Sequence, residues 1–499
     1  MKLKRISANK LNRISRKKKV ICFGAGELLA KTFCDIKDLN IEKNIAFIVD
    51  NDSSKWGQKK RINNSELKIC IPEKIYELDA KEYCILITTM RIKEVYAQLQ
   101  NMIRDSKIAC YCLPSYRYGS VKYLSFIASK MPLRNYILLQ GEGDTYENAS
   151  ALARYIRSNN YYDKYKIVWL CDNPQRFIPT KRERYIKRNV NLTTISLKEI
   201  WRYNYYVNCS RYVFFENQMT PRRREQQVTM YMNHGSPPIK STKGKINISK
   251  DVNYVVCPSE NVADIVAEQY GVNKERMIYC GSPRTDILFD GKLNDKLCSM
   301  LDVKEYKKVI LWVPTFREHK NKSRVDSDAN YTYGIPIIHN ENVYDELVSY
   351  LKMHNVLLII KPHQNQDMSK VTINPCKNIC ILRNDQLEKV AASVYDVMKI
   401  ADAMITDYST IAFDFMMLDK MIGYTLDDFE EFKIGFSVKQ PLEFMPGNKI
   451  YNVNHLLEFF DCVIEKKDDY MDERKKINEF INEYKGNNCE RLLKKLRMI

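Results

Sequence analysis

The sequence predicts an α/β protein, in which a smaller Rossmann-like domain precedes a pair of larger Rossmann-type lobes. Short apolar runs of strand length alternate with helical stretches along the chain, and this pattern is typical of parallel sheets. The alternation pauses near residue 120 and restarts at 135, and polar loops follow many of the strands. A chain of 499 residues is long enough for two to four domains. The predicted parts are a basic tail at 1–19, a Rossmann-like accessory domain at 20–120, and lobes at 121–290 and 291–499.

Charge and cysteine usage narrow the class of protein. Lys and Arg number 80 against 61 Asp and Glu, so the net charge of +19 predicts anionic partners such as nucleotides, phosphopolymers, nucleic acid or a membrane surface. The 15 cysteines are scattered without a CxxC pair, which indicates reduced thiols and no zinc site. No apolar run approaches the roughly 18–20 residues that span a bilayer, and no signal peptide is evident. We therefore expect an intracellular protein.

The segment 1–19 contains nine Lys or Arg residues, and Leu3, Ile6, Leu11 and Ile14 approximate one helical stripe. Such a segment could lie on an anionic leaflet, where each cation contributes on the order of 1 kcal/mol. A solvated, disordered tail is the alternative interpretation. Nucleic-acid binding is a third, but no recognition helix or aromatic stacking motif supports it, so no nucleic-acid partner is expected.

The accessory domain is predicted from four strands that alternate with helical stretches. Gly24 and Gly26 form the turn between the first strand and its helix, and Asp50 ends the second strand at about the distance of a ribose-binding acid. Ala30 stands near where the third fingerprint glycine would fall, so both a bound nucleotide and a purely structural turn remain open. The pattern "FGAGE…VDND…KWG" resembles a Rossmann-like module found beside sugar and polymer transferases. The strands are predicted within 18–33, 44–52, 83–90 and 107–113.

Two successive series of strands and helices predict the two lobes. Each series places polar loops at the carboxyl ends of its strands, which is where open α/β sheets bind ligands. The pattern therefore predicts a cleft between the lobes, as in the architecture called GT-B. The first series comprises 135–156, 165–174, 212–217, 226–240, 253–271 and 276–288, and the second comprises 307–319, 355–365, 377–384 and 394–426.

Two loops of the first lobe carry candidate site residues. His234 follows an apolar strand in "NHGSPPIK", with Lys240 within reach, and a neutral histidine is a suitable general base near pH 7. Arg284 follows another strand in "GSPRTD", and a guanidinium group offers paired donors to phosphate. The structural alternatives are a hydrogen-bonded loop histidine and a salt bridge between Arg284 and Asp286.

Strand ends of the second lobe carry further candidates. Two strands of this lobe each end in a cation and a second polar residue. Because both pairs of residues are expected at one edge of the sheet, they argue for an anion site. A later strand ends in Asp407, and Ser409 and Thr410 begin the following helix, whose N-terminus exposes unpaired N–H groups that favour phosphate. Simple N-capping by Ser409 is the alternative. The two pairs are Thr315 with Arg317 in "VPTFRE" and Lys361 with His363 in "KPHQN".

These loops, in this order, resemble the CDP-glycerol glycerophosphotransferase family, the polymerases and primases of teichoic-acid and related capsule synthesis. The resemblance spans roughly 135–460 and rests on "NHGSPPIK", "GSPRTDIL", "VPTFRE", "KPHQN" and "ADAMITDYSTIAFDFMMLDKMIGY", followed by "DDFEEFKIGF". The chain departs from the family's usual residues at Ser236, Thr285, Gln364 and Thr410. Ser236 and Thr410 keep a hydroxyl group, whereas Thr285 and Gln364 change the hydrogen-bonding preference.

The resemblance implies transfer of a polyol phosphate, in the first place glycerol phosphate, from a CDP-polyol to a hydroxyl of a growing cell-surface polymer, with release of CMP. It implies His234 as base on the acceptor hydroxyl and His363 and Arg317 as groups that stabilise charge on the phosphate. It assigns donor binding to Ser409, Thr410, Lys361, Arg284, Thr315 and Asp407. We expect no metal ion or other cofactor, because cations line the rim.

The expected partners are a CDP-polyol donor, a lipid-linked anionic polymer and, through 1–19, an anionic membrane surface. The expected location is cytoplasmic, on the inner face of the bacterial plasma membrane. A GT-B glycosyltransferase that uses a nucleotide-sugar for surface polysaccharide is the alternative function. A dinucleotide-binding module built on Gly24 and Gly26 is a second alternative. The sequence leaves open glycerol against ribitol phosphate, primase against polymerase, the acceptor and the oligomeric state.

Overall fold

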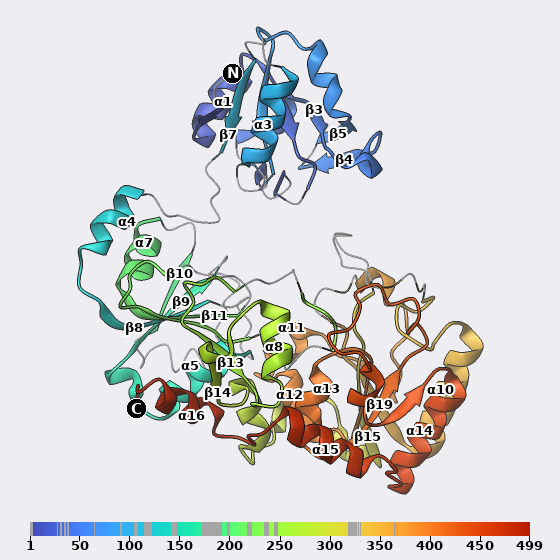
Figure 1. The fold of residues 1–499 in the computed structure, drawn as a ribbon. Coiled ribbons are helices and arrows are strands. Elements are labelled where there is room, and N and C mark those ends of the chain that lie inside the picture. The colour runs from blue at the N-terminus through green and yellow to red at the C-terminus, as the bar shows by residue number, and fades with distance from the viewer. Residues whose placement is uncertain are drawn as a thin grey trace. The chain divides into compact units, whose positions relative to one another are not determined.

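The computed structural model divides the chain into two compact units, 1–118 and 119–499 (Figure 1). Each unit is described by itself below. The described residues are 3–26, 28–29, 32–33, 36, 39–63, 65–89, 92–103, 108–113, 122–140, 147–171, 192–196, 200–216, 222–233, 239–243, 248–317, 327, 329, 331–363, 366 and 368–499.

The first unit contains a seven-stranded sheet in the order β1-β7-β6-β2-β3-β5-β4, as predicted for a Rossmann-like domain. Its pairings are parallel except that between β4 and β5. Apolar residues fill both faces of the central strands, so these strands read as continuous apolar runs. The strands and α-helices among the described residues of this unit are β1 (Leu3–Arg5), α1 (Ala8–Ser15), β2 (Lys19–Phe23), β3 (Ile45–Val49), β4 (Lys59–Ile62), β5 (Ser65–Cys70), β6 (Tyr83–Ile87), α3 (Ile92–Met102) and β7 (Ala109–Cys112).

The prediction of a separate tail at 1–19 needs correction. Strand β1 pairs in parallel with β7 at the edge of the sheet, and α1 follows it directly. Ile6 and Leu11 are buried in the core of the unit, and Ser7 accepts a hydrogen bond from the backbone N–H of Lys10 as N-cap of α1. The apolar stripe read from the sequence therefore faces the unit's own core.

The second unit begins with a seven-stranded parallel sheet in the order β10-β9-β8-β11-β12-β13-β14. Alternate residues of β8 enter different clusters: Ile137 and Leu139 join one, and Leu138 joins the other. The sheet elements are β8 (Arg134–Gln140), β9 (Lys166–Cys171), β10 (Leu192–Ser196), β11 (Ser210–Phe215), β12 (Val228–Tyr231), β13 (Tyr254–Cys257) and β14 (Met277–Tyr279). Helices among the described residues of this lobe include α4 (Lys122–Ser129), α5 (Asn148–Ser158), α7 (Ile200–Cys209) and α8 (Ala263–Tyr270), and the 3₁₀ segment η7 (Pro283–Phe289) follows β14.

A second, six-stranded parallel sheet has the order β17-β16-β15-β18-β19-β20. Its strands are β15 (Lys308–Val313), β16 (Val356–Ile360), β17 (Ile379–Ile381), β18 (Ala403–Thr406), β19 (Met421–Thr425) and β20 (Asn448–Ile450). Its helices are α9 (Asp295–Met300), α10 (Glu341–His354), α11 (Asn384–Lys389), α12 (Val394–Ile400), α13 (Ile411–Met416), α14 (Val453–Glu465) and α15 (Met471–Ile481). The predicted fold class, a GT-B-like pair of lobes after a smaller Rossmann-like domain, is confirmed.

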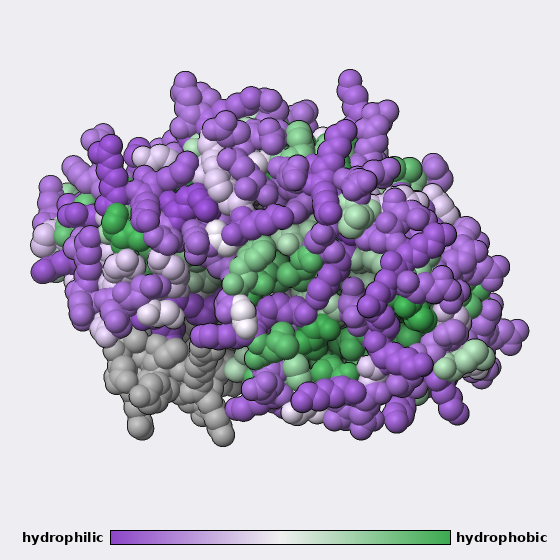
Figure 2. Space-filling view, turned by 90° about the horizontal axis from the view of Figure 1, so that it is seen from below, coloured by the Kyte–Doolittle hydropathy of each residue, from purple (hydrophilic) through white to green (hydrophobic). Residues whose placement is uncertain are grey.

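One apolar core joins the two lobes. It contains Phe215 and Val255 from the first sheet together with Leu311 and Leu357 from the second. Removal of this much apolar surface from water favours a fixed arrangement of the lobes. On the face shown in Figure 2, hydrophilic side chains surround apolar patches near the middle.

The C-terminal end of the chain returns to the first lobe. Helix α16 (Asn488–Lys495) places Cys489, Leu492 and Leu493 in the core cluster of the first sheet. The Asp286 carboxylate accepts hydrogen bonds from the backbone N–H groups of Asn488 and Cys489 at 2.8 and 2.9 Å. The predicted lobe at 291–499 is therefore continuous in sequence but contributes its last helix to the other lobe.

Candidate active site

The carboxyl ends of four neighbouring strands form the candidate site. In the second sheet β16, β15, β18 and β19 are adjacent and parallel, so the loops that follow them meet at one edge. Backbone N–H and side-chain groups at such an edge are available to a ligand. All the predicted site residues of the second lobe follow the ends of these strands: Thr315, Arg317, Lys361, His363, Asp407, Ser409 and Thr410.

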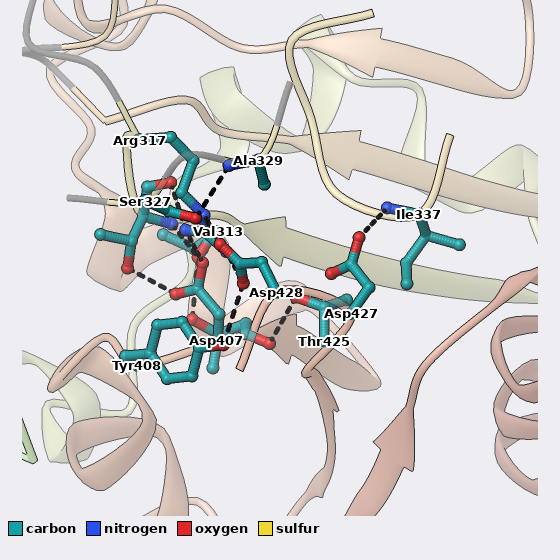
Figure 3. A network of polar contacts seen from close by, with 12 residues as sticks. Val313, Arg317, Ser327, Ala329, Ile337, Asp407, Tyr408, Thr425, Asp427 and Asp428 are labelled. Carbon is teal, nitrogen blue, oxygen red and sulfur yellow. Dashed lines mark hydrogen bonds and ion pairs between the residues drawn. The ribbon is translucent and has the colours of Figure 1, made fainter. Parts of the chain in front are cut away.

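Arg317 and Asp407 meet directly at this edge (Figure 3), and Thr315 contacts the same carboxylate. The Asp407 carboxylate accepts a hydrogen bond from the backbone N–H of Thr315 at 2.9 Å and another from the Thr315 hydroxyl. The Arg317 guanidinium donates to the same carboxylate at 2.7 Å. Burial alone raises the pKa of Asp407, but Arg317, the Thr315 hydrogen bond and the Lys240 ammonium outweigh it, so this pKa lies below its ordinary value. Asp407 is therefore a buried anion that links the ends of β15 and β18.

Arg317 is also paired with Asp428, which follows β19. Its Nε and Nη2 atoms donate to the two Asp428 oxygens at 2.6 and 2.9 Å, and the Tyr408 hydroxyl donates to Asp428 at 2.9 Å. Burial is the largest single effect on the pKa of Arg317 and lowers it, but Asp407, Asp428 and Tyr331 together raise this pKa well above its ordinary value, so the guanidinium stays charged. The Arg317 side chain is only 8% exposed. This geometry supports a role in holding three strand ends together, whereas the sequence suggested direct contact with phosphate.

Lys361 and His363 lie at the end of the neighbouring strand β16. The Lys361 side chain is buried, and its ammonium donates to the carbonyl of Pro362 at 3.1 Å. The half-buried His363 imidazole packs against the Phe316 ring with 5.0 Å between centroids. Since Phe316 lies between Thr315 and Arg317, the two predicted pairs of residues lie together at one edge of the sheet.

Ser409 and Thr410 precede α13 as predicted. Both are partly exposed, and the Ser409 hydroxyl is 3.5 Å from the backbone nitrogen of Ile411, a long contact for a cap. Thr410 makes no capping bond through its side chain. The capping alternative is thus weakly supported, and the predicted phosphate contact stays a prediction.

Arg284 has a different environment from the one expected. Its Nε and Nη2 atoms donate to the Asp414 carboxylate on α13 at 2.9 and 3.2 Å, and both side chains are at most 3% exposed. Asp286, its expected salt-bridge partner, instead binds the start of α16. Burial lowers the pKa of Arg284, but Asp414, Tyr395 and Glu147 together raise it well above its ordinary value. The geometry therefore supports an ion pair between the lobes, and not the predicted phosphate contact.

His234 lies outside the described residues, but the residues on both sides of its loop are described. Before the loop, Asn233 is buried with φ +65°, and its side-chain oxygen accepts a hydrogen bond from the Tyr270 hydroxyl at 2.8 Å. After the loop, Lys240 pairs with Phe436 of the second lobe in an isolated antiparallel bridge. Lys240 also lowers the pKa of Asp407. The motif that contains His234 thus ends at the strand tips of the second lobe.

Three functional candidates were missed in the sequence: Asp427, Asp428 and His339. Asp427 follows β19 and accepts the backbone N–H of Ile337 at 3.0 Å, which supports a rare positive φ of 67° for that β-branched residue. Burial raises the pKa of Asp427, and the His339 imidazole lies 3.7 Å from its carboxylate. The adjacent acids in "LDDFEEF" at the end of an apolar strand were the available signal.

The glycine turn of the first unit favours the structural interpretation. Gly24 has φ +113°, and a Cβ atom there would lie 3.1 Å from the Thr88 carbonyl oxygen. The Asp50 carboxylate accepts the backbone N–H of Ala25 at 2.6 Å. A phosphate at this turn would have to compete with that carboxylate for the same N–H group.

Within the described ranges, no group of three or more His, Cys, Asp or Glu side chains is arranged to hold a metal ion. The same residues include no helix that is both long and apolar enough to cross a bilayer.

Comparison with known proteins gives one family and a consistent fold. The sequence profile described as CDP-Glycerol:Poly(glycerophosphate) glycerophosphotransferase matches residues 124–497. A teichoic acid poly(glycerol phosphate) polymerase of Staphylococcus epidermidis is 24% identical over 334 residues, which are 60% of this chain and 42% of that protein. The teichoic acid ribitol-phosphate polymerase TarK of Staphylococcus aureus is 25% identical over 247 residues, 48% of this chain and 44% of that protein. The chain thus spans less than half the length of these two relatives.

Among solved structures, the wall teichoic acid polymerase TagF superposes with a TM-score of 0.58 at 16% identity. The match covers 82% of this chain and 95% of the TagF chain. At this identity the likeness concerns the fold, and it supports the two-lobed architecture described above.

Proposed function

Since the chain belongs to the CDP-glycerol:poly(glycerophosphate) glycerophosphotransferase family, we propose that it transfers a polyol phosphate from a CDP-polyol to a hydroxyl group of a growing cell-surface polymer. Glycerol phosphate is the first candidate for the transferred group. The observation that carries the proposal is the convergence of cationic and hydroxyl side chains on one rim of the second sheet, beside the end of the His234 motif.

In the proposed reaction, the acceptor hydroxyl oxygen attacks the β-phosphorus of the donor. A new P–O bond forms, the bond to the bridging oxygen breaks, and CMP leaves with that oxygen. His234 takes the proton of the attacking hydroxyl, and Lys361 and His363 stabilise the charge on the transferred phosphate. Ser409 and Thr410 bind the diphosphate at the start of α13. Arg317 contributes indirectly, because it fixes Asp407 and Asp428 at the ends of β18 and β19.

A donor panel tests this function. The full chain is incubated with a lipid-linked glycerol phosphate acceptor and CDP-glycerol, CDP-ribitol or UDP-sugars, and the released nucleotide is identified. We expect CMP from a CDP-polyol. Release of UDP from a UDP-sugar, with no CMP from either CDP-polyol, would instead support the GT-B glycosyltransferase alternative.

We also propose that the reaction needs no divalent metal ion, because protein cations lie at the proposed phosphate site. Turnover in the same assay is expected to be unchanged by EDTA. A loss of activity in EDTA that magnesium restores would contradict this part of the proposal.

We further propose that the protein works at the inner face of the bacterial plasma membrane, where a lipid-linked acceptor would lie. The residues 1–19 are poor candidates for apolar insertion, because their stripe is buried. A better surface is formed by the neighbouring helices α4 and α7, where Trp201 is 71% exposed and Phe126 is 62% exposed. The exposed Lys130 and Arg202 lie on or beside the same helices, and Lys130 lies over the Phe126 ring at 5.3 Å from its centroid. Aromatic side chains flanked by cations suit an anionic interface.

The double substitution Phe126→Ala with Trp201→Ala is expected to weaken binding to vesicles that contain anionic lipid by about tenfold, since it removes much of the insertable area. Co-sedimentation measures the effect. Met353→Ala is the matched control, because Met353 is 79% exposed on α10 of the other lobe. Equal sedimentation of all three proteins would exclude this surface.

A further inference from the structure

Asn148, the first residue of α5, makes hydrogen bonds that the neighbouring sequence does not predict. The side chain is fully buried, and its Nδ2 atom donates to the carbonyls of Met232 and Asn233 at 2.8 and 3.1 Å. Its Oδ1 atom accepts the backbone N–H of Arg284 at 3.0 Å. One amide group thus satisfies two carbonyls and one N–H of separate loops.

These contacts continue into the second lobe. Arg284, which Asn148 holds through its backbone, is paired through its guanidinium with Asp414 on α13. The Tyr395 hydroxyl of α12 donates to the same carboxylate at 2.8 Å. Asp414 lies four residues after Thr410, about one helical turn from the start of α13.

We propose that Asn148 is a positioning residue for the transfer reaction, an inference that rests on the proposed function. Through Arg284 and Asp414, it couples the backbone directly before residue 234 to α13, the helix that Ser409 and Thr410 precede. One buried hydrogen-bonded network therefore sets the distance between the backbone that leads to residue 234, on the acceptor side, and the start of α13, on the donor side.

Physical chemistry favours such a role for this amide. Each residue of this hydrogen-bonded network is buried, so the loss of one partner leaves a polar group unsatisfied. The loops are then expected to shift to recover a hydrogen bond. Group transfer is sensitive to such shifts, and a displacement of about 1 Å can cost on the order of 100-fold in rate. Asparagine is required because it is both donor and acceptor, whereas aspartate of the same shape would oppose its oxygens to two carbonyls.

The test compares Asn148→Ala with Asn378→Ala in the full chain. Asn378 is a matched control, because it is also buried and its Nδ2 atom donates to two backbone carbonyls, that of Leu351 on α10 and that of Val356 at the start of β16. We expect Asn148→Ala to lower kcat for CMP release by about 100-fold, with a change in KM for the donor of less than about threefold. Asn378→Ala should keep kcat within about threefold of the unmodified protein while lowering thermal stability to a similar degree.

Amide hydrogen exchange gives a readout that does not need the reaction. Asn148→Ala should accelerate exchange both in 228–233 and in 411–416, whereas Asn378→Ala should leave both segments unchanged. If Asn148→Ala does not fold, Asn148→Asp replaces it, with the same expected directions. Normal kcat, an equal kcat loss in the control, or faster exchange in the first-lobe segment alone would overturn the inference. If the unmodified protein turns over no CDP-polyol, the proposed function fails, and exchange still decides whether the two segments are coupled.

Discussion

Arg317→Met is expected to destabilise the second lobe by about 3–5 kcal/mol, because it removes the counter-charge from two buried carboxylates. Asp407 and Asp428 are at most 1% exposed, and both bind the Arg317 guanidinium. A loss of this size is a large fraction of the roughly 5–15 kcal/mol that stabilises a typical domain. Urea unfolding, followed by circular dichroism, measures the change.

Two comparisons separate this structural role from direct phosphate binding. Arg383→Met removes an exposed arginine that pairs with Asp385, and it should change stability by less than about 1 kcal/mol. Adding Asp428→Asn to Arg317→Met should recover part of the lost stability, since one of the two uncompensated charges is then absent. A stable Arg317→Met protein that lacks only activity would show that Arg317 acts on the substrate instead.

His363→Ala is expected to lower the turnover number for CMP release by about 10²–10⁴-fold without unfolding the protein. The imidazole is half-buried at the end of β16 and packs on Phe316 beside the Thr315–Asp407 contact. Its removal should therefore cost charge stabilisation at the phosphate more than it costs packing. His234→Ala, which removes the proposed base, is expected to give a loss of similar size.

The control for His363→Ala is His354→Ala. The His354 ring also stacks on an aromatic neighbour, Tyr350, at 4.3 Å between centroids, but it ends α10 away from the carboxyl strand tips. Rates and melting temperatures of the three histidine variants are compared with those of the unmodified protein. Near-normal rates in both His363→Ala and His234→Ala would remove the histidines from the proposed mechanism.

Much of the site in the second lobe could be predicted from the sequence. Apolar runs such as 356–360 and 403–406 identify buried parallel strands, and the polar residue that directly follows each run must lie at a strand end. This reasoning located Thr315, Lys361 and Asp407 at one edge. It could not assign partners to Arg284 and Arg317, because the choice between phosphate and carboxylate depends on residues more than 80 positions away.

The segment 1–19 shows the same limit of sequence-based prediction for an amphipathic segment instead of a charged side chain. Its charge and helical stripe are consistent with a membrane-bound tail, a free tail or an edge element, since all three use an amphipathic pattern. Pairing of β1 with β7, whose paired residues lie 107 positions further along the chain, decides among them. Sequence periodicity reports which face of a helix is apolar but not what covers that face.

The sequence by itself determined the order of strands and helices, the doubly wound class of both lobes and the loops in which polar groups gather, because these depend on local periodicity and on glycine or proline at turns. Tertiary structure alone decided that Arg317 and Arg284 bind carboxylates, that α16 returns to the first lobe and that the Asn148 amide joins the loop after β12 to the backbone of Arg284. The physical reason is that a buried charge or amide is stabilised only by partners that folding brings within hydrogen-bonding distance, and those partners are remote in the sequence.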